Sequence, residues 1–517
     1  MIDCYRMLAK ILSASLFGLE TVPIDVEVNL YKKGFPGFNI IGLPNKSIDE
    51  SKERVKTALA NSNIEFPQAK IVVNLAPADI PKEGAGFDLP IAIGILASLQ
   101  GVVIPKNKSM FYGELSLDGT LRHTKGVFLL AMGARQIGVK NLFVPVDSAN
   151  EGSFIKGINI YPVKDLKQLI SHLSKEEQIA KITPKPLKSL LIEENIDCNF
   201  DEIIGQNSAK RAMEVSASGG HNIFMQGPPG AGKTMLARAL AGVLPPLSEN
   251  ESLEVTKIYS VTGNIPPGES VIIERPYRVS HHTTSRIGLI GGGSNPHPGE
   301  ISLAHRGVLF LDEFPEFSRG TLEALRQPLE DGKVTITRAA GTAEYPAQFM
   351  LVAAANPCPC GYLGDEKHAC KCSPRQVMRY QAKLSGPLMD RIDLHVNVPA
   401  VDVEKLIPKE GKIVKPESSK VIRGRVIAAR EIQKRRFKGT KIHSNGDMRN
   451  KDIKNFCKID PAALVLLKQA VNNYNLSART YFRLIKVSQT IADLEGVSKI
   501  LPAHVAEALQ YRIRSGD

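Results

Sequence analysis

The sequence lacks any apolar run that approaches the ~18 residues of a membrane-spanning helix, which excludes a helical integral membrane protein. Its first residues, Met1 to Arg6, show no basic stretch followed by an apolar segment, so the pattern of a secretion signal is absent. Cysteine is scarce: the 517 residues include seven, of which four are clustered. This usage argues against a disulfide framework and is typical of a reducing compartment. We expect a cytoplasmic protein that does not enter the membrane.

Length and charge narrow the class of protein further. A chain of 517 residues is too long for one core and predicts about three domains. The formal net charge of +13 favours a polyanionic partner such as nucleic acid. A basic cytoplasmic protein without such a partner would have the same composition, so the charge alone does not decide between the two.

A phosphate-binding loop lies near the middle of the chain. Residues 227–234 fit the pattern G-x-x-x-x-G-K-[ST], with an apolar run of strand length before them and a helical pattern over 235–244 after them. A strand, a Gly-rich loop and a helix N-terminus surround phosphate oxygens with backbone N–H groups. We expect Lys233 to reach the β- and γ-phosphates of ATP and Thr234 to bind Mg²⁺. The predicted nucleotide-binding residues are Gly227, Pro228, Pro229, Gly230, Ala231, Gly232, Lys233 and Thr234.

An acidic pair follows a second apolar run, Val308 to Leu311. The run predicts a buried central strand, and ligands bind beyond the carboxyl ends of such strands. We expect Asp312 to hold Mg²⁺ through water and Glu313 to orient or deprotonate the attacking water. By itself this motif is weak, but about 80 residues after a complete phosphate loop it becomes a strong signal.

Other polar residues are candidates for the same site. Asn356 follows the apolar strand 349–352 and is a candidate sensor of the γ-phosphate and the attacking water. Arg391 and Arg479 are candidate guanidinium groups that stabilise charge on the transferring phosphoryl group, Arg391 from a neighbouring subunit and Arg479 from a helical lid. Taken from the residues alone, a surface salt bridge explains each arginine equally well.

Two isoleucines precede the phosphate loop at the distance at which such proteins hold adenine. Ile203 and Ile204 would offer apolar contact to the base. An ordinary helix start is the alternative interpretation of this segment.

The first 170 residues alternate strand and helix signals and predict an α+β domain. Period-two alternation over 22–30 predicts a strand with one buried face. Residues 47–61 predict a helix with Ser47 as its N-cap and Glu50 as the capping-box partner. Further strands are expected at 70–75, 142–145 and 158–161, and a helix at 89–99.

Within this domain, segments 82–93 and 113–119 resemble the proteolytic domain of Lon-type proteases. That family works with a Ser nucleophile and a Lys base. The resemblance puts Ala85, or else Gly84, at the nucleophile position, and the stretch where the base would lie contains no lysine. Lys125 lies one residue before that stretch, and Ser116 is an alternative hydroxyl. We predict a Lon-like fold that serves as a scaffold or interaction domain rather than a protease.

Taken together, the motifs resemble the magnesium-chelatase-like AAA+ ATPases of the YifB/ComM type. The resemblance runs nearly from end to end. It implies an α/β AAA+ core of the helix-2-insert clade, a ring oligomer such as a hexamer, Arg391 as the arginine finger and Arg479 as the lid sensor. For ComM-type members it also implies DNA binding and ATP-driven branch migration during recombination. The segments that carry it are 281–284, 291–293, 298–305, 325–330, 356–361, 385–395 and 507–512.

Two segments are candidates for DNA contact. One lies between the phosphate loop and the acidic pair, and the other follows the pair. Residues 260–306 form a long Gly/Pro/His-rich insertion with few helix or strand signals. Residues 333–345 predict a β-hairpin, and in relatives such hairpins face the ring pore. His281, His282, Arg286 and Arg338 would contact phosphates there, or else these loops pack between subunits.

The clustered cysteines predict a metal centre. Cys358, Cys360, Cys370 and Cys372 form two C-x-C pairs, and four thiolates suit tetrahedral Zn²⁺ in a structural role. His368 is a possible replacement for one ligand. A disulfide and chance clustering are the alternatives, the former unfavourable in the cytoplasm.

Residues 171–198, with Pro184 and Pro186, predict a linker with a short helical piece. The pattern is helical from 401 on, and the basic stretch 420–438 is either a phosphate contact or a solvated face. The expected division is a Lon-like domain at 1–170, a linker at 171–198, an AAA+ core at 199–400 with a Cys-rich insertion at 358–372, and a helical lid at 401–517.

These predictions converge on an ATP-driven DNA motor, a branch-migration helicase. The alternative is a chelatase-type ATPase that remodels a protein partner. ATP-dependent proteolysis is disfavoured because the nucleophile–base pair is missing, and a slowly hydrolysing scaffold is disfavoured by Glu313.

Overall fold

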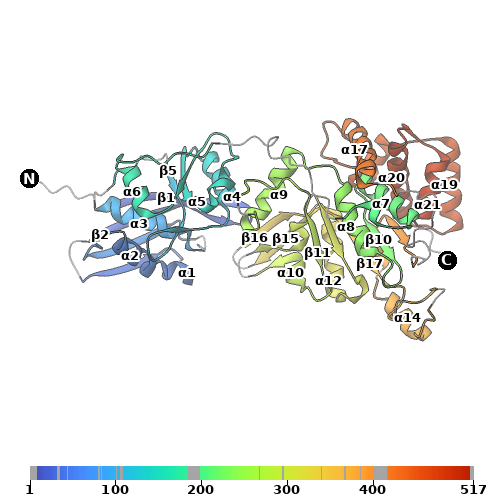
Figure 1. The fold of residues 1–517 in the computed structure, drawn as a ribbon, viewed down its shortest axis with the longest axis horizontal. Coiled ribbons are helices and arrows are strands. Elements are labelled where there is room, and N and C mark those ends of the chain that lie inside the picture. Colours follow the sequence, from blue (N-terminus) through green and yellow to red (C-terminus); the bar gives the residue numbers. More distant parts are fainter. Residues whose placement is uncertain are drawn as a thin grey trace, which may run out of the picture.

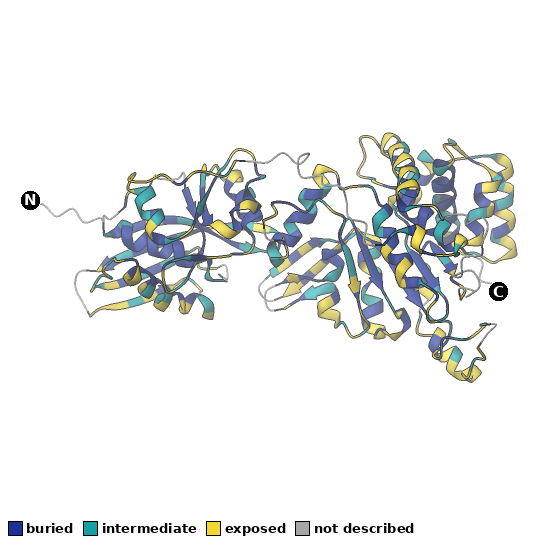
Figure 2. Ribbon diagram, in the orientation of Figure 1, coloured by how far each residue is buried: buried dark blue, intermediate teal, exposed yellow. Residues whose placement is uncertain are grey.

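A computed structural model describes residues 8–512, except 32–34, 44, 80–81, 83, 100–101, 105–108, 184–197, 267, 294–295, 339–340, 366–367, 385 and 401–415. Figure 1 shows an elongated chain, with an N-terminal sheet domain at one end, a second sheet in the middle and a helical region at the other end. Buried residues concentrate in the strands of both sheets (Figure 2). Among the described residues, none of the helices is long and apolar enough to cross a membrane.

A seven-stranded mixed sheet organises the N-terminal domain, in the order β3-β4-β2-β1-β5-β8-β9. β2 pairs antiparallel with β1 and β4, and the other neighbours are parallel. Along its second half, β2 alternates buried and half-buried residues, which confirms the strand predicted over 22–30. The strands are β1 (Leu8–Phe17), β2 (Glu20–Tyr31), β3 (Gly37–Ile41), β4 (Lys70–Ala76), β5 (Ser109–Phe111), β8 (Asn141–Pro145) and β9 (Asn159–Val163), with a small pair of β6 (Glu114–Leu115) and β7 (Leu121–Arg122).

Helices pack on this sheet, and α3 is buried along almost its whole length. The prediction for the first helix was wrong at its start. The side chain of Asn45, and not that of Ser47, accepts from the N–H of Ile48, and Glu50 lies at the junction of two helices without a side-chain cap. The helices are α1 (Lys46–Asp49), α2 (Ser51–Asn61), α3 (Asp88–Ser98), α4 (Val127–Gln136), α5 (Val146–Gly152) and α6 (Leu166–Leu173).

The central sheet has five parallel strands in the order β11-β14-β17-β10-β18. β14 and β17 consist entirely of buried residues, as expected for strands covered on both faces. The strands are β10 (Ile223–Gln226), β11 (Tyr277–Ser280), β14 (Val308–Leu311), β17 (Met350–Ala355) and β18 (Leu394–Asn397). The helices before and between them are α7 (Asn207–Gly219), α8 (Lys233–Val243), α9 (Glu249–Thr262), α10 (Arg286–Ile290), α11 (Glu300–Leu303), α12 (Arg319–Ala324), α13 (Arg326–Asp331), α14 (Pro374–Gln381) and α15 (Gly386–Met389).

The region 260–306 is more regular than its sequence indicates. It contributes β11, an edge strand of the central sheet, and a small antiparallel pair of β12 (Gly291–Gly292) and β13 (His297–Pro298). β11 is short and only partly buried, which is why its hydrophobic period is invisible. The predicted hairpin is confirmed as β15 (Lys333–Arg338) and β16 (Gly341–Pro346).

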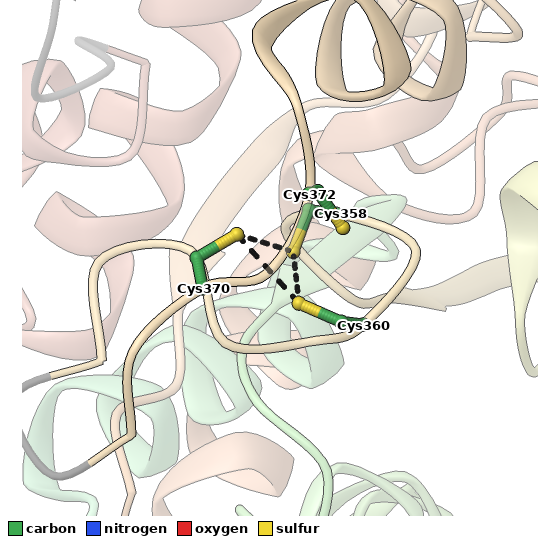
Figure 3. Close-up of side chains that lie close together, drawn as sticks. All are labelled: Cys358, Cys360, Cys370 and Cys372. Carbon is green, nitrogen blue, oxygen red and sulfur yellow. Dashed lines mark hydrogen bonds between the residues drawn. The ribbon is translucent and has the colours of Figure 1, made fainter.

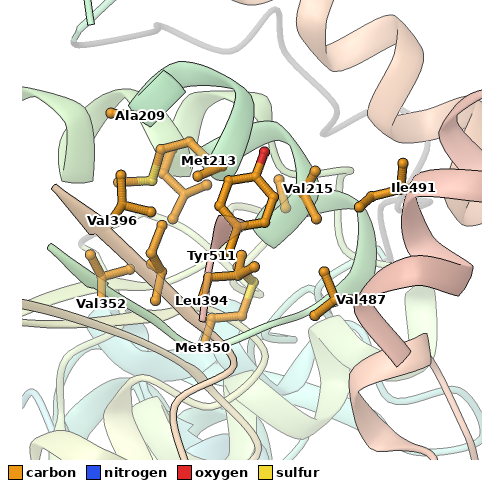
Figure 4. Close-up of a cluster of buried hydrophobic side chains, with 14 of the residues drawn as sticks. Ala209, Met213, Val215, Met350, Val352, Leu394, Val396, Val487, Ile491 and Tyr511 are labelled. Atoms are coloured by element: carbon orange, nitrogen blue, oxygen red, sulfur yellow. The ribbon is translucent and has the colours of Figure 1, made fainter. Parts of the chain in front are cut away.

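The C-terminal helices share one hydrophobic core with the central sheet. Figure 4 shows Val487 and Ile491 of α20 beside Tyr511, together with residues of α7 and of strands β17 and β18. These helices are therefore packed on the sheet and not only tethered to it. The elements are α17 (Ser419–Arg436), α18 (Asn450–Phe456), α19 (Pro461–Asn473), α20 (Ala478–Leu494) and α21 (Pro502–Gln510), with a short parallel pair of β19 (Lys458–Ile459) and β20 (Lys499–Ile500).

The N-terminal domain contacts the central region of the chain, at the turn between β1 and β2 and along α9 among other positions. At the turn between β1 and β2, a Cβ placed on Gly18 would lie 3.1 Å from Cβ of Ala343 in β16. On α9, the hydroxyl of Ser260 donates to Oε2 of Glu151 at 2.8 Å, and its carbonyl accepts from the N–H of Gly126 at 2.9 Å. Most of the predicted linker, residues 184–197, lies outside the described residues.

Candidate nucleotide site and metal centre

The phosphate loop joins β10 to α8 at the carboxyl edge of the central sheet. Gly230 and Gly232 have φ values of 76° and 85°, a conformation that side chains with a Cβ rarely adopt. Lys233 is the first residue of α8 and is almost fully buried. Its Nζ donates to the carbonyls of Gly227 at 2.7 Å and Pro228 at 2.9 Å, and burial lowers its pKa. The ammonium group therefore lies inside the loop that the sequence predicts to bind phosphate.

Asn356 reaches the same ammonium group. It follows β17, the neighbour of β10, and its Oδ1 accepts from Lys233 Nζ at 3.1 Å. The structure thus brings together a predicted sensor and the predicted phosphate-binding lysine.

The predicted Mg²⁺ ligands also meet. Thr234 Oγ1 donates to Oδ2 of Asp312 at 3.3 Å, and Asp312 comes directly after β14. A hydroxyl and a carboxylate are hard oxygen ligands of the kind that Mg²⁺ prefers. Both side chains are accessible enough to receive a hydrated ion. This donor set fits the magnesium of a nucleotide complex.

Glu313 has two histidine neighbours, which the sequence indicates as DNA contacts or as residues that pack between subunits. His282 Nδ1 lies 2.8 Å and His281 Nε2 lies 3.7 Å from Oε2 of Glu313. The histidines follow β11 and the glutamate follows β14, and these strands are paired side by side. The structure thus places the imidazoles at the predicted catalytic carboxylate. Recognition of β11 as a strand would have been needed to predict this contact.

The two candidate arginines meet at a carboxylate that sequence reasoning missed. Oε1 of Glu330, in α13, lies 2.8 Å from Arg391 and 2.7 Å from Arg479. Hydrogen bonding and charge from these arginines, first from Arg391, lower the pKa of the Glu330 carboxyl. Among the described residues, no hydrogen bond or ion pair joins either arginine to the phosphate loop or to the acidic pair. Within one subunit, the structure keeps these two groups of predicted site residues apart.

The two isoleucines differ in exposure. Ile203 is buried, whereas Ile204 is 36% exposed and available for contact. Gln206, not singled out from the sequence, donates to the carbonyls of Ala231 in the phosphate loop and Pro399. This amide ties the predicted adenine-side segment to the loop.

The four clustered cysteines converge (Figure 3). The Sγ–Sγ distances are 3.4 Å for Cys358–Cys360, 3.7 Å for Cys358–Cys370 and 3.6 Å for Cys360–Cys370. All four sulfurs, including that of Cys372, lie within 4.8 Å of one another. A tetrahedral site with Zn–S bonds of about 2.3 Å has sulfurs about 3.8 Å apart, close to these values. The spacing of the four sulfurs thus fits a tetrahedral zinc site. The imidazole of His368 is not required as a fourth ligand.

Backbone donors favour a thiolate at one position of this cluster, whereas the pKa values of Cys370 and Cys372 are raised, in part by the neighbouring thiols. N–H groups of Tyr362 and Lys371 lower the pKa of the Cys360 thiol to about 6. The cluster also abuts the nucleotide site, because a Cβ placed on Gly361 would lie 2.5 Å from Cδ of Pro229 in the phosphate loop.

The basic C-terminal stretch uses its arginines within the protein. In α17, Arg425 pairs with Glu214 and Glu417, Arg430 donates to the carbonyl of Ala217, and Arg436 pairs with buried Asp493. The sequence predicts that this helix is either a phosphate contact or a solvated face. These three arginines fit neither interpretation, because each is bonded within the protein. Their role is structural.

The Lon-like positions show no assembled nucleophile and base. Ala85 begins a short 3₁₀ turn, and Ser116 accepts a hydrogen bond from Arg122 at 2.7 Å. The side chain of Lys125 packs on Gly263 of the central region. Among the described residues, no hydrogen bond joins Ser116 to Lys125. The absence of proteolysis stays a prediction.

Comparison with known proteins is consistent with this architecture. Residues 199–406 match the family described as magnesium chelatase, subunit ChlI, residues 26–148 match a second ChlI family description, and 416–512 match the ChlI C-terminal family. The chain is 42% identical to competence protein ComM of Haemophilus influenzae, over 98% of this chain and 97% of that protein. It is 40% identical to the YifB protein of Escherichia coli, over 96% and 95%. A partial N-terminal similarity, 26% identity over 35% of this chain and 37% of the relative, extends to Lon protease 2 of Bacillus subtilis.

Proposed function

The chain belongs to the ComM/YifB family of magnesium-chelatase-like ATPases, and we propose that it is a ring-forming ATP-hydrolysing motor that acts on DNA. Its proposed task is branch migration during recombination, including recombination in natural transformation. The observation that carries the ATPase part is the meeting of Lys233 with Asn356 and of Thr234 with Asp312 around one phosphate loop.

In the proposed mechanism, each side chain has a distinct task. Backbone N–H groups of the loop and Lys233 bind the phosphates, and Asn356 positions the γ-phosphate through its contact with Lys233. Thr234 and Asp312 would hold Mg²⁺, which would neutralise charge on the phosphates. Glu313 orients the attacking water and accepts its proton, with the imidazole of His282 beside the carboxylate.

A complete site requires a second subunit in this proposal. Arg391 and Arg479 converge on Glu330 and do not contact the phosphate loop of their own chain. Exchange of the Glu330 carboxylate for the phosphates of ATP bound to a neighbour would bring both guanidinium groups to the transferring phosphoryl group. A closed ring, proposed to be a hexamer, supplies such a neighbour to every site.

DNA as the substrate is supported by charge and by kinship. The net charge of +13 suits a polyanion, and the relative with 42% identity is named a competence protein. The cysteine cluster is proposed to hold structural Zn²⁺, whose four protein ligands leave no open catalytic position.

One observation favours the alternative, a chelatase-type ATPase that remodels a protein. The turn between β1 and β2 packs on the β15–β16 hairpin at Ala343, so part of the proposed pore hairpin already has a protein neighbour. A protein client bound by the N-terminal domain would act directly on that hairpin.

Steady-state ATP hydrolysis distinguishes the two functions. The purified protein is assayed without DNA and with single-stranded DNA, duplex or a four-way junction, each at low and moderate salt. The DNA motor predicts stimulation, strongest with the junction and weaker as salt rises. Brisk hydrolysis that no DNA changes would contradict the motor and favour protein remodelling.

A further inference from the structure

The cysteine cluster belongs to an arm that projects from the molecule. We define the cysteine arm as residues 357–384, between β17 and α15. Figure 1 shows its helix α14 at the outer margin, away from both sheets, and Figure 2 shows that this helix is largely exposed. α14 begins with a capping box of Ser373 and Gln376, so its start is locally defined. Among the described residues of the arm, α14 is the only helix and none lies in a strand.

The arm presents cations that the protein does not use internally. Lys371, Arg375 and Arg379 are exposed, and among the described residues none forms an ion pair or a side-chain hydrogen bond. Arg375 and Arg379 are four residues apart in α14 and therefore lie on one face of the helix. The arginines of α17 differ from these three cations because Arg425 and Arg436 form ion pairs with carboxylates.

The positions of these three cations on the surface suit contact with a polyanion. The net charge of the arm is a weaker argument. A Zn²⁺ ion held by four thiolates carries a net negative charge, which would offset part of the positive charge nearby. Arg guanidinium groups on an exposed helix face bind phosphate oxygens in a directed way. Met378, 65% exposed, lies between the two arginines in sequence and adds apolar surface.

The base of the arm rests on the nucleotide site. Gly361 packs so closely on Pro229 of the phosphate loop that a Cβ would lie 2.5 Å from its Cδ, and 3.8 Å from Cγ of Asn356. Gln381, at the end of α14, donates to the carbonyl of Pro357 at 3.4 Å. Movement of α14 would therefore displace residues in contact with the phosphate loop and with Asn356.

We propose that Lys371, Arg375 and Arg379 of the cysteine arm form a contact surface for the phosphate backbone of nucleic acid, linked to the phosphate loop through Gly361. This inference rests on the proposed DNA function and names the surface that carries it. The contact reads phosphates and not bases, so it is independent of sequence. Through the contact of Gly361 with the phosphate loop, DNA bound to this surface would influence the ATP site.

The test compares two variants that each lose two cations. The double variant Arg375→Gln/Arg379→Gln keeps good helix formers in α14. The control Arg135→Gln/Lys140→Gln removes two exposed charges from the N-terminal domain. DNA affinity is measured by fluorescence anisotropy with a labelled single strand, with a non-hydrolysable ATP analogue present, across a range of salt concentrations. Zinc content and circular dichroism verify that both variants are folded.

If these residues contact DNA, the Arg375→Gln/Arg379→Gln variant should bind DNA more weakly than the wild type. The control variant should bind DNA as the wild type does. Loss of two phosphate contacts would reduce the slope of log K against log salt by about 1.4 for single-stranded DNA. Stimulation of ATP hydrolysis by DNA would fall with it. If the wild type binds DNA and the arm variant matches the control in affinity and slope, the inference is wrong and the DNA function stands. If the wild type binds no DNA at low salt, the proposed DNA function fails, and this surface fails with it.

A second measurement needs no variant. Acetylation of lysines in the full protein, followed by mass spectrometry, reports which lysines a bound oligonucleotide covers. The inference predicts protection of Lys371 and none of Lys468, an exposed lysine of α19. Equal labelling of Lys371 with and without a saturating oligonucleotide would overturn it.

Discussion

Nδ1 of His282 lies 2.8 Å from a carboxylate oxygen of Glu313. The two residues follow β11 and β14, which are adjacent parallel strands, so the backbone itself brings them together. His281 is farther away, at 3.7 Å from the same oxygen. An imidazole thus lies directly beside the carboxylate that is proposed to activate water.

This contact predicts a loss of turnover in His282→Ala. A carboxylate without its partner samples other rotamers, so kcat for ATP should fall about ten-fold, a part of the 10²–10⁴ that a general base typically contributes. The KM for ATP should change little, because Lys233 and the loop are untouched. His281→Ala is the matched control and should lose less. Equal kcat in wild type and His282→Ala would show that the imidazole does not position Glu313.

The arginine pair predicts complementation between two inactive variants. Lys233→Ala should bind ATP weakly, and Arg391→Ala should assemble but fail to hydrolyse. Mixed rings contain interfaces in which an intact phosphate loop faces an intact Arg391, so mixing should restore part of the activity. The measurement is ATP hydrolysis against mixing ratio. Mixtures that never exceed the separate activities, despite demonstrated subunit exchange, would place Arg391 outside the neighbouring site.

The burial of the Glu151 carboxyl, which the hydrogen bond from Ser260 only partly offsets, predicts a pH dependence of stability. Burial raises the pKa of the Glu151 carboxyl to about 7, against ~4.3 in an unfolded chain. Between these pH values the folded state holds a proton that the unfolded state releases. The stability from this group is therefore full below pH ~4.3 and falls as pH rises to about 7, by at most about 4 kcal/mol.

Glu151→Gln removes this titration because its side chain stays neutral. The melting temperature of the variant, relative to the wild type, should rise between pH 5 and pH 8. His123 lies 3.7 Å from Glu151 and, when protonated, would favour the charged carboxylate, so His123→Ala is measured alongside. A difference between variant and wild type that stays constant with pH would refute a raised pKa at Glu151.

The cysteine cluster predicts bound zinc in protein purified without a chelator. Elemental analysis should find about one Zn²⁺ per chain, because the sulfur spacing already matches a tetrahedral site. Cys370→Ser should lower the zinc content and disorder the arm, whereas Cys457→Ser, outside the cluster, should keep its metal. Less than half an equivalent of zinc in well-folded wild-type protein would contradict the assignment.

The parts of the site that are local in sequence were predictable, and the parts that depend on packing were not. The loop 227–234, the acidic pair and the cysteines carry their chemistry within a few residues. The partners of Arg391 and Glu313 depend on which strands become neighbours. β11 is a short, partly buried edge strand without a clear period, so neither its place nor the position of His282 beside Glu313 followed from the sequence.

The fold shows the same limit. The buried strands β14 and β17 were visible as continuous apolar runs, and the alternation in β2 marked one buried face. The start of the first helix was misplaced, because Asn45 and Ser47 both suit an N-cap and the backbone selects between them. The sequence left the basic helix α17 as either a phosphate contact or a solvated face, because the carboxylate partners of its arginines are distant in sequence.

The central claim is that ATP hydrolysis drives movement along DNA. The most direct measurement is strand separation from a synthetic four-way junction with one labelled arm, with the wild type and Glu313→Gln compared in the presence of ATP. A DNA motor driven by ATP hydrolysis predicts ATP-dependent separation by the wild type and none by Glu313→Gln, although that variant still binds ATP. A wild-type protein that binds the junction and hydrolyses ATP, yet releases no strand, would contradict it.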